Sequence, residues 1–201
     1  MVKKYSIVAL FATLCLSTLS FATLVKQINV EELSQTSEKI VYATVQGVKV
    51  EGPSGARKFS STVITFSVHD TWKGAPSQTV ALRQLTNDYK SRLHAVIPLP
   101  VFKVGEKVVV FLSKEGRLGM ASPMGLEQGV FRFPSKQGET ISENTTIANQ
   151  FKNKNLMQNV ASKKLKQYMA TQKIDATQER KLLTFGELKK MVKISTEKAA
   201  P

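Results

Sequence analysis

The chain has 201 residues, with 29 Lys and Arg against 15 Asp and Glu, which gives a formal net charge of +14. It contains one cysteine, Cys15, so an internal disulfide framework is excluded. The length suits one domain with a hydrophobic core plus appendages, and it is too short for two ordinary domains to be expected.

The first 22 residues have the pattern of a secretory signal peptide. Two lysines precede an apolar run, residues 7–19, that is too short to span a membrane, and Ser20-Phe21-Ala22 supplies small residues for signal peptidase. We expect cleavage after Ala22, a periplasmic or secreted protein, and no transmembrane span in the mature chain. A lipid-anchored Cys15 is the less favoured alternative, because the large Leu14 precedes it.

The excess positive charge is concentrated near the carboxyl terminus. Residues 151–201 hold 12 Lys and Arg against 4 Asp and Glu, whereas residues 23–150 hold 15 against 11. Such a basic region can bind an acidic polysaccharide or an anionic membrane surface, or it can be a solvated helical face that keeps the protein soluble. Nucleic acid is not expected as a partner, because export would separate the protein from it.

The amino-terminal half of the expected mature chain favours strands. Residues 23–37 have near-helical spacing of apolar residues and predict a short amphipathic helix. Residues 40–50 are rich in β-branched side chains, and Gly47 within them indicates a bulge or bend of the kind that a small barrel needs. Residues 59–72 alternate apolar and polar side chains, and residues 79–85 form a third expected strand.

The next segments continue the expected sheet. Residues 86–104 are irregular and predict a long loop, and residues 107–112 are apolar enough for a strand buried on both faces. Residues 118–121 and 129–133 complete five or six strands. Residues 134–155 are polar and have the composition of a linker.

Two helices are expected in the basic region, residues 156–201. The first has an apolar stripe that consists of Met157, Ala161, Leu165 and Tyr168. The second begins at Thr184, which has capping-box spacing to Glu187. The polar faces carry six candidate polyanion-binding lysines: Lys163, Lys164, Lys166, Lys189, Lys190 and Lys193.

No motif predicts a catalytic or metal site, and no cofactor is expected. The two histidines, His69 and His94, are too few for a zinc site in a mature chain that has no cysteine. Several carboxylates could form an acid–base pair in space, although the sequence does not pair them: Asp70, Asp88, Glu106 and Glu127.

Three short motifs define the expected architecture. Trp72-Lys73-Gly74 closes the long strand, Gly105-Glu106-Lys107 opens the next apolar strand, and the stretch from Gly125 to Phe131, which contains Gln128-Gly129, leads into the last strand. In this order they resemble a family of uncharacterised exported bacterial proteins, over residues 23 to about 133. The expected helix at 184–194 resembles a common carboxyl-terminal element of that family.

The strand layout is also similar to the five-stranded OB-type barrel of tissue inhibitors of metalloproteinases and netrin modules. This resemblance implies a mainly β fold, with an OB-like barrel domain at residues 23–133 that includes the short amino-terminal helix and is followed by carboxyl-terminal helices. In those inhibitors an amino-terminal cysteine binds the target's zinc. Here the expected new terminus is Thr23, so that mode of inhibition does not carry over.

These observations lead to three functional hypotheses. The first is a non-enzymatic interaction module of the bacterial cell envelope, acting on or with an exported protein such as a protease. The second is a binder of polyanions or anionic membranes through the six lysines. The third is an enzyme with a site in the 86–104 loop, centred on Asp88 and His94.

Overall fold

The computed structural model describes most of the chain beyond the expected signal peptide. The described residues are 26–55, 58–86, 99–134, 140–151, 153, 156–174 and 183–197. The expected signal peptide, residues 1–22, lies outside them, and so do Asp88 and His94.

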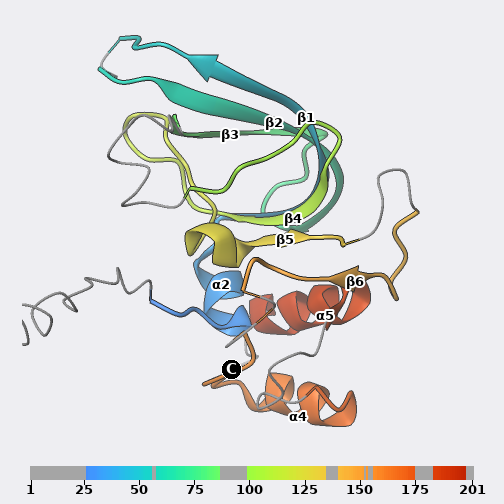
Figure 1. Cartoon of the computed structure of the whole chain (residues 1–201). Coiled ribbons are helices and arrows are strands. Elements are labelled where there is room, and N and C mark those ends of the chain that lie inside the picture. Colours follow the sequence, from blue (N-terminus) through green and yellow to red (C-terminus); the bar gives the residue numbers. More distant parts are fainter. Residues whose placement is uncertain are drawn as a thin grey trace, which may run out of the picture.

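The described part is mainly β, with a five-stranded antiparallel sheet and three α-helices (Figure 1). The sheet consists of β1 (Lys39–Glu51), β2 (Ser61–Lys73), β3 (Thr79–Leu85), β4 (Lys107–Leu112) and β5 (Val130–Arg132). A second, two-stranded sheet pairs β6 (Thr146–Ile147) with β7 (Leu183–Thr184). The helices are α2 (Val30–Thr36), α4 (Lys163–Thr171) and α5 (Phe185–Thr196), and a 3-10 turn, η2 (Leu126–Gly129), precedes β5.

The five strands lie in the order β3-β2-β1-β4-β5, and every neighbouring pair is antiparallel. The sheet curves strongly, because β1 and β2 shift register at three points along their pairing (Figure 1). One shift falls between Val45 and Gly47, which confirms the bulge expected at Gly47. Among the described residues β3 and β5 do not pair, so no closed barrel is formed; the Ala121 N–H donates to the Arg83 carbonyl at 2.8 Å, which ties β3 to the chain beyond β4.

The concave side of the sheet encloses one apolar cluster. Alternate residues of β1 and β4 point into it, and the ring of Phe102 meets that of Phe66 edge-on at 5.4 Å between centroids. Phe66, Ile64 and Leu82 are almost completely buried there, as the alternation in β2 and β3 predicts.

The opposite face of β1, β4 and β5 is covered by the helices. Val109, Phe111 and Phe131 pack with α2, with α5 and with residues 156–160 in a second apolar cluster. Five consecutive residues of β4, from Val108 to Leu112, are buried, which confirms a strand covered on both faces. α5 lies between the sheet and α4, which is the outermost layer (Figure 1).

Two expectations about secondary structure are wrong. Residues 26–29, which were expected to be helical, are not, and α2 begins at Val30 because Asn29 caps it and accepts from the Glu32 N–H at 2.8 Å. Residues 118–121 form no strand, because the left-handed Gly119 closes a turn there.

The segment 134–155 is more than a linker. Ile147 in β6 is fully buried in the helix-covered cluster, and Ala148 exchanges two hydrogen bonds with Arg132 of β5. Asn149 and Asn153 are also buried and hold the following turn through reciprocal hydrogen bonds. This polar segment is therefore part of the packed structure.

The basic region folds largely as expected. The Thr184–Glu187 capping box is present, and α5 buries Leu188, Met191 and Val192 against the sheet. The preceding helix is shorter than its apolar stripe, because α4 starts only after its N-cap, Ser162.

The motif residues hold the ends of elements together. Lys73 Nζ donates to the Ser34 and Gln35 carbonyls, at 2.9 and 2.8 Å, at the end of α2. Gln128 binds the Ile28 N–H and the Lys26 carbonyl, both at 2.9 Å. The Trp72 indole donates to Asp70 at 3.0 Å, and its ring packs on Phe185 of α5.

Two motif glycines occupy left-handed turns. Gly74 (φ +88°) and Gly105 (φ +84°) have backbone conformations that larger residues rarely adopt. The Gly105 N–H donates to the Val45 carbonyl at 2.8 Å, which places this turn beside the bulge in β1.

Candidate functional site

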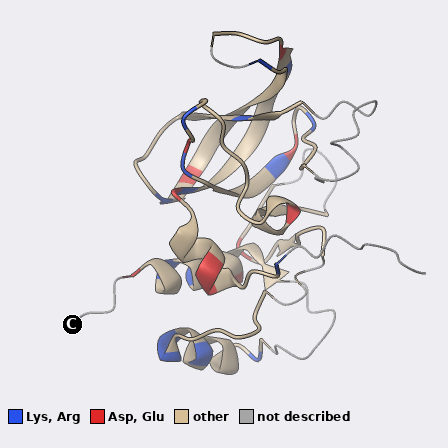
Figure 2. Cartoon of the chain, turned by 90° about the vertical axis from the view of Figure 1, so that its left-hand side faces the viewer, with Lys and Arg blue, Asp and Glu red and all other residues tan. Residues whose placement is uncertain are grey.

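The lysines of α4 and α5 gather on the side of the molecule away from the sheet. In Figure 2 the lowest helix is α4, and the blue parts of its ribbon mark its lysines, Lys163, Lys164 and Lys166. The two helices are joined by an ion pair between Lys164 of α4 and Glu197 at the end of α5. This ion pair brings Lys164 of α4 close to Lys190 and Lys193 of α5.

Five of the six candidate lysines are exposed, and these five are hereafter called the lysine surface: Lys163, Lys164, Lys166, Lys190 and Lys193. Among the described residues, only Lys164 of this group forms an ion pair. Four positive charges therefore face solvent without a described carboxylate partner.

The pKa of the Glu197 carboxyl is lowered by lysine charges that lie close to it. A hydrogen bond from Lys164 and the charge of that lysine lower the pKa of the Glu197 carboxyl, and the charges of Lys193 and Lys190 lower it further. One carboxylate is thus surrounded by lysines from two helices. An incoming anion would meet the same positive field.

Lys189 does not belong to this surface. Its Nζ lies 2.7 Å from Asp70 Oδ2 of β2, and the side chain is only partly exposed. Asp70 also accepts from the Trp72 indole, so this pair fastens α5 to the sheet. The structure therefore separates Lys189 from the other five candidate lysines.

A pocket lies beside the lysine surface, under α4. Its walls are mostly apolar, and Asn159 and Lys166 are the polar residues at it. The apolar residues that line it are Met157, Val160, Met169, Ala170 and Ile174. No sequence pattern indicates this pocket, because Met157 and Ile174 lie outside α4 and reach the pocket through turns.

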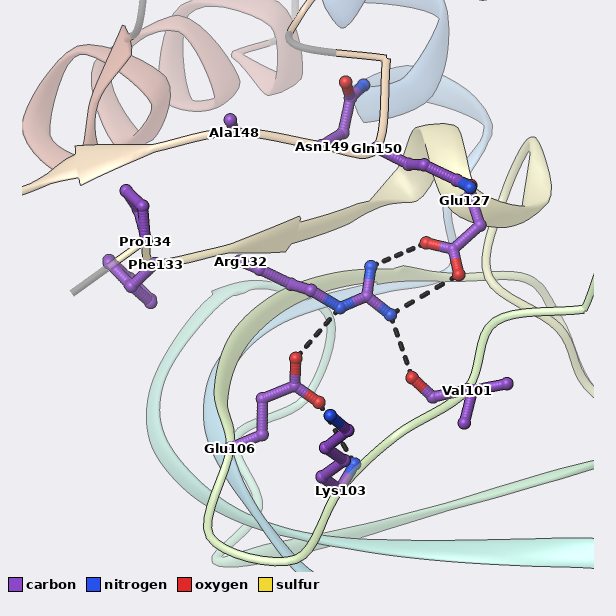
Figure 3. Close-up of a pocket in the computed structure, with 10 residues that line it drawn as sticks. All are labelled: Val101, Lys103, Glu106, Glu127, Arg132, Phe133, Pro134, Ala148, Asn149 and Gln150. Carbon is purple, nitrogen blue, oxygen red and sulfur yellow. Dashed lines mark hydrogen bonds and ion pairs between the residues drawn. The ribbon is translucent and has the colours of Figure 1, made fainter. Parts of the chain in front are cut away.

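A second hollow is organised around Arg132, as Figure 3 shows. Arg132 Nε donates to Glu106 at 2.9 Å, Nη1 donates to Glu127 at 2.6 Å, and Nη2 donates to the Val101 carbonyl at 3.1 Å. The guanidinium also lies 5.8 Å from the centre of the Phe102 ring. These partners use all three guanidinium nitrogens, so this arrangement is a clamp between β5, η2 and the turn before β4.

Sequence analysis did not identify Arg132. The signal for it is a charged residue between two phenylalanines in an otherwise apolar strand. Glu106 and Glu127, two of the carboxylates considered as an acid–base pair, are thus brought together by their ion pairs with Arg132.

His69, the described histidine, makes contacts within the fold. His69 lies on the polar side of β2, where its Nε2 is 2.7 Å from Thr44 Oγ1 and its ring packs on Tyr42. Burial raises the pKa of the Tyr42 hydroxyl. No cluster of three His, Cys, Asp or Glu side chains suited to a metal ion occurs within the described ranges.

Two further findings bear on the class of protein. In the part of the chain that the structure covers, no helix has the length and apolar character needed to cross a bilayer. Comparisons with known protein families, with curated proteins and with solved structures find no match to this chain.

Proposed function

We propose that the protein is an exported, non-enzymatic binding module of the bacterial cell envelope that holds an anionic component on its lysine surface. The observation that carries this proposal is the ion pair that joins Lys164 of α4 to Glu197 at the end of α5, with the charges of Lys190 and Lys193 close to the same carboxylate. Export rests on the signal-peptide pattern of residues 1–22.

The fold supports a binding role in a second way. A strongly curved, five-stranded antiparallel sheet with the order β3-β2-β1-β4-β5 is compatible with an OB-type barrel, a partly open architecture that serves many binding proteins. We interpret the sheet as a scaffold for the carboxyl-terminal helices, and these helices as the part that binds the anionic component. Action on an exported protease stays a prediction that depends on the resemblance alone.

The described candidate catalytic groups also favour binding over catalysis. Asp70, Glu106 and Glu127 each form an ion pair that joins elements of the fold. The alternative enzyme site at Asp88 and His94 lies outside the described residues and stays a prediction.

Charge reversal on α5 tests the proposal. We expect the mature protein to bind heparin at low salt, with an affinity that falls as salt is raised. The double variant Lys190→Glu, Lys193→Glu should bind about 10-fold or more weakly, because each reversal turns an attraction into a repulsion. Both side chains are exposed, so folding should be preserved.

A matched control separates this surface from net charge. Lys49→Glu, Lys58→Glu makes the same change in net charge at exposed positions near the tip of the β1–β2 hairpin, at the other end of the molecule from α4 (Figure 1). Heparin affinity should change little in this variant. Equal weakening by both pairs, or no heparin binding by the unmodified protein, would contradict the proposal.

A further inference from the structure

We infer that the anionic component is a lipid, with its phosphate at Lys166 and Lys163 and part of an acyl chain in the pocket under α4. This inference rests on the proposed function and adds the chemistry of the ligand. Its motivation is the junction of a cationic rim with an apolar pocket at one end of α4.

The pocket walls are side chains of the helix-covered core that border an opening. Met157, Val160, Met169 and Ile174 are each between 4 and 7% exposed and belong to the same apolar cluster as α5. Methionine is unbranched and polarisable, so two methionines in the wall adapt to a flexible chain. Burial of methylene groups against these side chains is favourable.

At the end of α4 the backbone turns back toward the residues that line the pocket. The Ile174 N–H donates to the Met169 carbonyl at 2.9 Å, and the Lys173 N–H donates to the Ala170 carbonyl at 3.1 Å. Lys173 is left-handed (φ +52°), which turns the chain back so that Ile174 faces the helix. On the other side, Met157 and Val160 come from the turn before α4.

The rim supplies the charge. Lys166 lines the pocket and forms no ion pair with any described residue, and no carboxylate lines it. Lys163 lies three positions earlier on the same helix, so the two ammonium groups share one side of α4. A ligand with an apolar tail and an anionic head matches both features.

This combination favours a lipid over an anionic polysaccharide. A polysaccharide would use the lysine surface but has no apolar segment to place among the two methionines, Val160 and Ile174. A phospholipid uses both, and its other chain can stay in the bilayer.

The experiment measures binding of a monomeric, short-chain phosphatidylglycerol to the full mature protein, with heparin binding measured in parallel. Ala170→Trp places a large side chain at an exposed position of the pocket wall. We expect it to weaken lipid binding about 10-fold and to leave heparin binding unchanged. Ala161→Trp, which is equally exposed and outside the pocket lining, should change neither.

Two single charge-reversal variants test where the lipid headgroup binds. Lys166→Glu should weaken lipid binding more than Lys190→Glu, although both remove an exposed lysine of the same surface. A folded Ala170→Trp variant that binds the lipid as tightly as the unmodified protein would overturn the inference. If the unmodified protein binds heparin but not the lipid, the inference is overturned and the proposed function stands. If the unmodified protein binds neither heparin nor the lipid, the proposed function is wrong.

Discussion

Gly129 occupies a place where no other residue fits without moving the backbone. A Cβ added there would lie 2.2 Å from the Met124 carbonyl oxygen, because the backbone of Met124 lies close to Gly129 at the end of η2. The neighbouring Gln128 fastens residues 26 and 28 to the same point. The Gln-Gly pair therefore stabilises this part of the fold in two ways. Gly129 allows a close backbone approach, and Gln128 forms two hydrogen bonds with the segment before α2.

Gly129→Ala should lower the free energy of unfolding by at least about 2 kcal/mol, since the carbonyl of Met124 must shift to admit the methyl group. Urea unfolding followed by circular dichroism measures the change. Gly47→Ala is the control, because a Cβ at Gly47 meets nothing within 4 Å, and we expect a change below about 1 kcal/mol. Similar losses in both variants would show that the close contact is not the cause.

Sequence patterns predicted these residues as important without predicting why. Gly47 marks a real bulge, yet the surrounding space does not require glycine there. Gly129 does require it, but the reason is a contact with a carbonyl five residues earlier that periodicity cannot reveal. The Arg132 clamp was missed for the same reason, because its partners Glu106 and Glu127 are distant in the chain or on a different element.

At the scale of elements, helix ends are stabilised by side chains from other parts of the fold. Lys73, at the end of β2, donates to two carbonyls at the carboxyl end of α2. Glu31 of α2 in turn accepts from the N–H groups of Ala161 and Ser162 at the start of α4, at 2.6 and 3.2 Å. Both contacts match the sign of the helix dipole at the end they meet.

Lys73→Met tests this arrangement at one end of α2. Loss of two charge-assisted hydrogen bonds and of the cation at the helix terminus should cost about 1–2 kcal/mol of stability. Thermal and urea unfolding provide the measurement. Lys49→Met, at an exposed position with no described ion pair, should change stability by less than about 0.5 kcal/mol. An unchanged midpoint for Lys73→Met would mean that water replaces the lysine at no cost.

The elements with a strong period were predictable, and the irregular ones were not. β2, β3, β4 and α5 lie within two residues of their expected bounds, because alternation or a capping box defines them locally. β6 was missed, since two residues within a polar segment carry no period, and only pairing with β7 makes them a strand.

At the scale of the whole molecule, the carboxyl-terminal region is part of the core. Leu156, Leu165, Leu188 and Met191 are buried in the cluster that covers the outer face of the sheet. The expected division into a barrel, a linker and a basic helical region therefore does not describe how the apolar surface is buried.

A chain that ends after residue 150 should not fold stably. It would leave Val109, Phe111 and Phe131 without α5 and residues 156–160, which share in covering them, and we expect aggregation or strong binding of a hydrophobic dye. A chain that ends after residue 197 keeps every described element and should behave like the full protein. A product that ends at residue 150 and is soluble and unfolds cooperatively would contradict this packing.

The meeting of the two ends of the chain has a consequence for biosynthesis. The Val30 N–H donates to the Leu156 carbonyl, and Val30 and Leu33 share their cluster with Leu188 and Ile194. Residues 30–33 leave a ribosome or a translocation channel long before residues 156–194, which the outer layer needs before it can assemble. We therefore expect the nascent chain to depend on a holding chaperone, because the apolar face of its sheet stays uncovered until those residues have been made.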